Sequence, residues 1–204
     1  MGMEQEIKLR APSIHVLEKI LVDPSVEALR ISEPETIEMN TVYYDTKDKL
    51  LAGRKWVLRC RTENDDTVIT LKTPADGNHL RGEWSLSGVG VVDGDIVSDH
   101  VFRALFSHGA PHQILDIRDK PLQSVCGVRF TRRRFRIKLD DSVAELALDC
   151  GQLHRGGRTA PLIEVELEVL RGAFSPVEAF ARELEDRFGL VEEPMSKYQQ
   201  TMCI

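Results

Sequence analysis

The chain has 204 residues, of which 42% are hydrophobic and 29% are charged, and its formal net charge is −6 at pH 7. This length is enough for one domain with a packed core. The negative charge argues against non-specific nucleic-acid binding as the main role, although clustered arginines can still bind a small anion. Four cysteines without C-x-x-C spacing argue against a zinc site or a disulfide framework. No signal peptide or membrane span is recognisable, so a cytoplasmic protein is expected.

Alternation of polar and apolar residues predicts eight strands. In chain order they cover residues 3–10, 37–45, 55–62, 66–73, 82–88, 127–139, 142–150 and 161–170. Turns are predicted at Asn64-Asp65-Asp66 and at Asp140-Asp141, each between two alternating runs. Helices are predicted at 13–21, 98–107 and 176–188. The last has Ser175 as its N-cap, Pro176 in its first turn and Gly189 at its end.

The first predicted strand carries the pattern Glu4-Gln5-Glu6-Ile7-Lys8. Because side chains alternate across a strand, Glu4, Glu6 and Lys8 share one face. Such a face can hold a metal ion and a phosphate together. A single pattern of this kind is also typical of the solvated face of an antiparallel strand.

The same alternation recurs in most later strands, and some of the polar faces are basic while others are acidic. The basic faces contain Arg59, Arg61, Lys72, Arg132, Arg134, Arg136 and Lys138; the acidic faces contain Glu145, Asp149, Glu164, Glu166 and Glu168. So many charged faces would make an unusual outer surface. They predict an α+β protein with an eight-stranded antiparallel β-barrel, closed or nearly closed, whose interior is polar and whose apolar outer faces are covered by helices.

Several of these motifs, in this order, resemble the CYTH family, also called triphosphate tunnel metalloenzymes. The motifs are Glu4-x-Glu6-x-Lys8, Tyr43-Tyr44-Asp45-Thr46, Leu58-Arg59-x-Arg61, Thr70-x-Lys72, Arg132-x-Arg134, Glu145-Leu146-Ala147-Leu148-Asp149 and Glu164-x-Glu166-x-Glu168. The resemblance spans nearly the whole chain and implies a single CYTH domain over residues 1–204. It is greatest to the CYTH module of bacterial inorganic triphosphatases. Some of these enzymes carry a helical CHAD domain after this module, and here a stand-alone CYTH protein is expected.

Tripolyphosphate carries several negative charges, and its transfer into a tunnel requires arginine and lysine donors in place of water. The candidate donors are Lys8, Arg59, Arg61, Lys72, Arg81, Arg132 and Arg134. The resemblance implies that five of them, Arg59, Arg61, Lys72, Arg132 and Arg134, hold the phosphates. Arg136 and Lys138 lie farther along their strand, and the sequence does not decide between the tunnel mouth and a solvated face for them.

The acids need a separate explanation, because carboxylates repel a polyanion. A hard divalent cation, Mg²⁺ or Mn²⁺, resolves this conflict since it binds carboxylate and phosphate oxygens together. The candidate metal ligands are Glu4, Glu6, Asp149, Glu164 and Glu166, and the candidate catalytic residues are Glu4, Glu6 and Lys8. The sequence leaves open the roles of Glu83, Glu145 and Glu168. The role of Lys197 is also open: it lies in a C-terminal segment that could close one end of the tunnel, but a surface lysine is favoured. No general base is assigned.

The resulting functional hypothesis is metal-dependent hydrolysis of inorganic triphosphate to pyrophosphate and phosphate. Two alternatives use the same scaffold, adenylate cyclisation from ATP and hydrolysis of thiamine triphosphate. A third, from a different class, is a non-catalytic polyphosphate-binding module. The expected partner is a small polyphosphate, with no nucleic acid and no membrane. The sequence does not decide the natural substrate, the choice of Mg²⁺ or Mn²⁺, or the oligomeric state.

Overall fold

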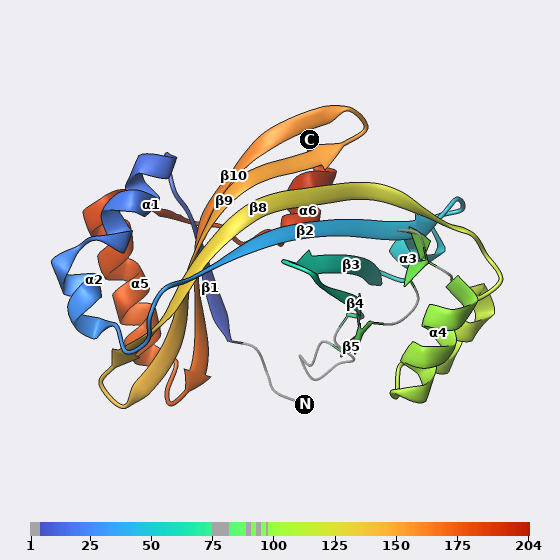
Figure 1. Ribbon diagram of the computed structural model, residues 1–204, viewed down its shortest axis with the longest axis horizontal. Helices are drawn as coiled ribbons and strands as arrows, with labels where there is room; N and C mark the ends of the chain where they lie inside the picture. Colours follow the sequence, from blue (N-terminus) through green and yellow to red (C-terminus); the bar gives the residue numbers. More distant parts are fainter. Residues whose placement is uncertain (1–4, 75–81, 89–90, 93–94, 97) are drawn as a thin grey trace. The chain divides into compact units, whose positions relative to one another are not determined.

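The computed structural model describes residues 5–74, 82–88, 91–92, 95–96 and 98–204 (Figure 1). The chain divides into two compact units. Unit 1 comprises Met1–Glu38, Phe130–Leu153 and Thr159–Gln200, and unit 2 comprises Met39–Arg129, His154–Arg158 and Thr201–Ile204. None of the helices in the described ranges is long and apolar enough to cross a lipid bilayer.

The strands are β1 (Glu6–Arg10), β2 (Glu35–Thr46), β3 (Val57–Glu63), β4 (Asp66–Lys72), β5 (Glu83–Ser87), β6 (Val91–Val92), β7 (Asp95–Ile96), β8 (Leu122–Leu139), β9 (Ser142–Arg155), β10 (Arg158–Arg171) and β11 (Val191–Glu192). The helices are α1 (Ile14–Leu21), α2 (Pro24–Leu29), α3 (Leu50–Gly53), α4 (Ser98–Ser107), the 3₁₀ helix η1 (His112–Ile117), α5 (Ser175–Phe188) and α6 (Lys197–Met202).

One large sheet contains all eight predicted strands and β11, in the hydrogen-bonded order β11-β1-β10-β9-β8-β2-β3-β4-β5. The pairs that flank β1, β3 and β4 are antiparallel. The predicted α+β class with an antiparallel sheet is therefore confirmed. Closure of a barrel by hydrogen bonds is not observed, because within the described part of the chain the order ends at β11 and at β5. Strands β6 and β7 form a separate pair.

In unit 1, helices α1, α2 and α5 lie together beside the strands β1, β8, β9 and β10 (Figure 1). Their apolar side chains share one core with the apolar faces of these strands. The predicted helix at 176–188 is found as α5, but its predicted N-cap is wrong. The helix begins at Ser175, and the N-cap position is Phe174, which makes no side-chain capping bond. Gly189 ends α5 as predicted, with a left-handed φ of 66°.

In unit 2, the apolar residues of β3, β4 and β5 pack with those of α3, α4 and η1 in a second core. The predicted turn after β3 is confirmed, since Asn64 has a left-handed φ of 52° and Asp66 already pairs with Glu63. The other predicted turn, between β8 and β9, is also confirmed, with Asp140 at a φ of 52°. Asparagine and aspartate tolerate this backbone conformation better than most residues. Helices α2, α3, η1 and α6 were not predicted.

In the Tyr43-Tyr44-Asp45-Thr46 motif, the buried Asp45 side chain caps backbone N–H groups at the start of α3. Asp45 is 4% exposed, and its carboxylate accepts hydrogen bonds from the backbone N–H groups of Thr46 (2.7 Å), Leu51 (2.9 Å) and Ala52 (3.0 Å). The Thr46 hydroxyl accepts another from the N–H of Leu50, at 3.0 Å. One side chain therefore satisfies several buried donors at the end of β2 and the start of α3.

The change Asp45→Ala is expected to lower the free energy of unfolding by about 3 kcal/mol, because it leaves buried N–H groups without an acceptor. Urea denaturation measures the loss. The matched control is Asp48→Ala, at an exposed aspartate three positions on, which should change stability by less than about 0.5 kcal/mol. Equal midpoints for the two variants would show that Asp45 does not carry the cap.

Candidate functional site

Three carboxylates lie together on the sheet of unit 1. Asp149 is on β9, and Glu164 and Glu166 are on β10. One carboxylate oxygen from each lies within 4.8 Å of the others. Their neighbours Leu148 and Val165 pack into the helix-covered core, so alternation places the three acids on the opposite face. We call Asp149, Glu164 and Glu166 the acid cluster.

Two cations touch the acid cluster. Arg132 on β8 donates from Nε to Asp149 Oδ1 (2.8 Å) and from Nη2 to Asp149 Oδ2 (2.7 Å), and Nη2 also contacts Glu166 Oε2. Lys197, at the start of α6, contacts all three acids. Its Nζ lies 2.9 Å from Asp149 Oδ2, 2.8 Å from Glu164 Oε2 and 2.6 Å from Glu166 Oε1. The side chain of Asp149 is fully buried, and that of Lys197 is 9% exposed.

A hydrogen-bond network extends the cluster to β1. Gln200 on α6 donates from Nε2 to Glu164 Oε1 at 2.6 Å and to the Met195 carbonyl at 3.1 Å. Lys8 donates from Nζ to the same carbonyl, at 2.9 Å. The Phe130 ring lies under both cluster cations, 5.7 Å from Arg132 Cζ and 5.3 Å from Lys197 Nζ. The cations are therefore held by acids on one side and by an aromatic face on another.

The ionisation of these groups reflects their mutual contacts more than their burial. Burial opposes the charge of Lys197, but the nearby Asp149, Glu166 and Glu164 carboxylates outweigh it and raise the pKa of the ammonium. Burial likewise opposes the charge of Glu166, but Lys197 and Arg132 outweigh it and lower the pKa of this carboxyl. For Arg132, burial is outweighed by Asp149, and the pKa of the guanidinium is raised. Lys197, Arg132 and Glu166 are therefore charged at neutral pH.

The acid cluster fits a hard divalent cation. Mg²⁺ and Mn²⁺ prefer carboxylate oxygens, and ligand oxygens around Mg²⁺ lie about 2.0–2.1 Å from the ion. The three oxygens of the cluster lie within 4.8 Å of one another, near enough for small side-chain shifts to bring them to one ion. Three of the predicted metal ligands, Asp149, Glu164 and Glu166, are thus brought together by the fold.

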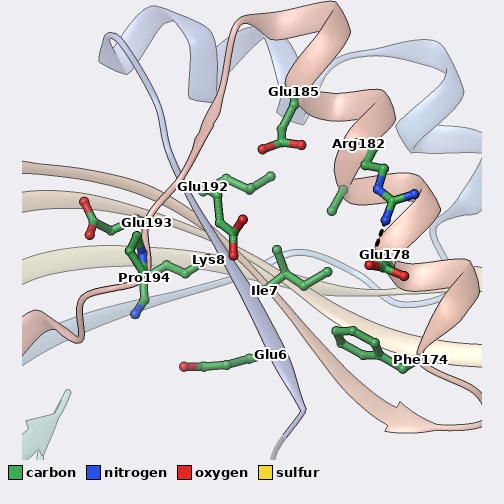
Figure 2. Close-up of a pocket in the computed structure, with 12 residues that line it drawn as sticks. Glu6, Ile7, Lys8, Phe174, Glu178, Arg182, Glu185, Glu192, Glu193 and Pro194 are labelled. Carbon is green, nitrogen blue, oxygen red and sulfur yellow. Dashed lines mark hydrogen bonds and ion pairs between the residues drawn. The ribbon is translucent and has the colours of Figure 1, made fainter.

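The other predicted residues of the first strand lie on β1. Figure 2 shows the Glu6 and Lys8 side chains leaving β1 on one side and Ile7 leaving on the other, as the alternation predicts. Lys8 pairs in register with Glu166, and Glu6 pairs with Glu168. Glu6 is exposed and lines a cavity of about 500 Å³ between β1, α5 and residues 192–194. Glu4 lies outside the described residues.

Arg134 is placed differently from Arg132. Its Nε and Nη2 contact Glu35 Oε2 at 2.9 Å, and its Nη1 lies 3.6 Å from Glu145 Oε2. Glu145 is therefore an ion-pair partner of Arg134. Arg134 thus contacts two acids outside the acid cluster, whereas Arg132 contacts two acids of the cluster itself.

In unit 2, the remaining predicted cations share a polar row across β3, β4 and β5. Lys72 Nζ lies 2.8 Å from Glu83 Oε2, and Arg59 Nη2 lies 4.0 Å from Glu83 Oε1. Thr70 and Ser85, which lie in register with Arg59 across the strands, share a hydrogen bond of 3.1 Å. Arg61 pairs with Glu63 at 3.4 Å. Arg81 lies outside the described residues.

Sequence reasoning missed two residues of the network. For Lys197 the sequence favours a surface position over one that closes the tunnel, but the residue is buried against the acid cluster. The strand alternation gives no signal for Gln200. The two residues are three positions apart on α6, a spacing that places both on one face of a helix. Alternation of polar and apolar residues identifies strands, whereas α6 is a helix of only six residues. The alternation could therefore not identify Lys197 and Gln200.

The change Arg132→Met is expected to destabilise the fold by about 3–5 kcal/mol, because it leaves the buried Asp149 and the partly buried Glu166 with fewer compensating charges. Urea denaturation at neutral pH measures the effect. The control is Arg136→Met, at an exposed position of the same strand, with an expected effect below about 0.5 kcal/mol. If Arg132→Met were as mild as this control, the contacts of Arg132 would not stabilise the acid cluster.

A relative of named function is found among known proteins. An inorganic triphosphatase from Haemophilus influenzae is 28% identical over 145 residues, which cover 70% of this chain and 39% of that protein. The match thus spans about two fifths of the length of this relative.

Solved structures share the fold at low identity. A proposed adenylyl cyclase from Hippeastrum, described as having a dominant triphosphatase activity, is 18% identical with a TM-score of 0.65, and the match covers 98% of this chain and 96% of that one. A proposed adenylate cyclase from Bacillus halodurans is 17% identical with a TM-score of 0.54, covering 96% and 94%. These likenesses concern the fold alone. The CYTH domain itself matches residues 2–201. This chain therefore belongs to the CYTH family.

Proposed function

We propose that this chain hydrolyses inorganic triphosphate to pyrophosphate and phosphate in a metal-dependent reaction. The observation that carries the proposal is the acid cluster, in which Asp149, Glu164 and Glu166 lie beside Arg132 on one face of the sheet. Arginine is a residue that commonly binds phosphate. Carboxylates that lie next to an arginine therefore suit a metal ion that is shared with an anionic substrate. The inorganic triphosphatase relative supports the same substrate class.

The acids also favour an enzyme over a module that only binds polyphosphate. Binding of an anion gains nothing from buried carboxylates, which repel it unless a cation intervenes. Burying Asp149 and Glu164 costs free energy that the fold must offset with ion pairs. We infer that this cost is tolerated because the acids bind a metal during the reaction.

The proposed substrate ligands are the arginines and lysines predicted from the sequence: Lys8, Arg59, Arg61, Lys72, Arg81, Arg132 and Arg134. Arginine donates in a planar fork that matches phosphate oxygens, whereas lysine acts as a point charge. The side chains of Arg59 and Arg61 are only 16% and 18% exposed. Partial burial strengthens their interaction with an anion, because less water screens the charge.

Mg²⁺ or Mn²⁺ at the acid cluster would neutralise phosphate oxygens and polarise water. The chain's own part is positioning. Arg132 holds Asp149 through both of its oxygens and Glu166 through one, which fixes the orientation of two of the acids. Gln200 holds Glu164 through Oε1. With ligands fixed in this way, in-line attack on a terminal phosphorus is promoted by electrostatics and orientation rather than by one general base.

With Mg²⁺ or Mn²⁺, the chain is expected to convert tripolyphosphate to pyrophosphate and phosphate, and EDTA should abolish turnover. Phosphate release is measured with tripolyphosphate, ATP and thiamine triphosphate in parallel. Faster turnover of ATP with cyclic AMP as product would select the cyclase alternative, and faster turnover of thiamine triphosphate would select the thiamine alternative. Hydrolysis that persists after chelation would overturn the role of the metal.

The isosteric change Glu164→Gln is expected to lower kcat by about 100-fold, because it removes a charged metal ligand but keeps the side-chain shape. In contrast, Arg59→Ala should weaken tripolyphosphate binding by roughly 10- to 100-fold, the equivalent of one charged hydrogen bond. Steady-state kinetics and calorimetry on the purified variants separate the two effects. Glu18→Gln, at an exposed position of α1, is the control for the loss of a carboxylate. Unchanged kcat in Glu164→Gln would remove this acid from the proposed metal site.

A further inference from the structure

We propose that Lys197 is an exchangeable counter-ion of the acid cluster, and that a divalent cation binds there only by displacing its ammonium group. The proposal rests on the metal site of the proposed function. It adds that, before the metal binds, the Lys197 ammonium group occupies this site. It makes Lys197 a residue that sets metal affinity, which is a different role from that of a surface lysine.

The geometry makes the two cations mutually exclusive. The Lys197 nitrogen lies between 2.6 and 2.9 Å from one oxygen of each acid. A metal ion that used the same oxygens would sit at about 2.0–2.1 Å from each of them, in the space that the ammonium nitrogen occupies. Two centres of positive charge cannot share that space, so the lysine side chain must leave when the metal enters.

The charges also match an exchange. The acid cluster carries three negative charges, and Arg132 contributes one positive charge from its own set of contacts with Asp149 and Glu166. If Lys197 leaves, the three acids and Arg132 together have a formal excess of two negative charges, which a divalent cation neutralises. If both Lys197 and the metal stayed, the same small volume would hold an excess of positive charge beside the buried Asp149.

The surrounding bonds allow Lys197 to move while the acids stay in place. Arg132 holds Asp149 and Glu166, and Gln200 holds Glu164 through the oxygen that Lys197 does not contact. Gln200 and Lys8 both donate to the Met195 carbonyl, which anchors the segment before α6. Lysine has a flexible four-carbon stem, so its ammonium can swing away without unfolding of the helix.

The first test is Mn²⁺ titration calorimetry on the full chain without phosphate. The change Lys197→Met removes the competing cation and should tighten Mn²⁺ binding by about tenfold or more relative to the unchanged chain. The control is Lys19→Met, which makes the same charge change at an exposed lysine of α1 in the same unit and should leave Mn²⁺ affinity unchanged. Equal affinity in Lys197→Met and the unchanged chain would overturn the proposal.

A second measurement needs no variant, so it holds even if Lys197→Met fails to fold. Lysines of the unchanged chain are acetylated with acetic anhydride, with and without Mn²⁺ at equal ionic strength, and each site is quantified by mass spectrometry. Lys197 should be protected without metal and should react several-fold faster with Mn²⁺, whereas Lys19 should react equally in both. Saturating Mn²⁺ with continued protection of Lys197 would mean that the metal binds without displacing it.

These outcomes differ from a failure of the proposed function. If Mn²⁺ bound neither to the unchanged chain nor to Lys197→Met, the metal site itself would be wrong, and the exchange would fall with it. If Mn²⁺ bound and supported hydrolysis but Lys197 stayed protected, the proposed function would stand and only the exchange would be refuted.

Discussion

Two buried carboxylates, Asp149 and Glu164, and the partly buried Glu166 beside them are the constraint on which the rest of unit 1 depends. Charges removed from water destabilise a fold unless partners of opposite sign touch them. The sequence supplies these partners from elements far apart in the chain, with Arg132 on β8 and Lys197 on α6. The same contacts that offset the burial of Asp149 therefore join β8, β9, β10 and α6. Stability and the proposed metal chemistry draw on one set of residues.

Unit 2 follows a related pattern in a milder form. Lys72 and Arg59 converge on Glu83, and Arg61 pairs with Glu63. These side chains remain partly exposed, so each ion pair contributes little to stability. An added anion would therefore meet only weak competition from these ion pairs. In both units, these cations already contact carboxylates, and an anionic ligand would have to compete with those contacts.

Period-two alternation was sufficient to find every long strand and to place Glu164 and Glu166 on one face. It could not show that Lys197 turns inward, because the contact depends on where a short helix meets the sheet. Arg134 illustrates a second limit. Alternation puts it on the same face as Arg132, but its partner Glu35 lies 99 positions earlier in the chain. Along β8, moreover, the buried positions change from Val128 and Phe130 to Phe135 and Ile137, so the covered face is not constant.

The bond from Lys8 to the Met195 carbonyl joins residues 187 positions apart. Bringing such distant segments together carries an entropic cost that is met only after intervening elements have formed. We therefore expect the network from β1 to the acid cluster to form late in folding rather than in its nucleus. A nascent chain carries all of β8, β9 and β10 before α6 is made, and during that interval the three acids lack Lys197. Until α6 folds onto the sheet, the ion pairs with Lys197 cannot offset their charge.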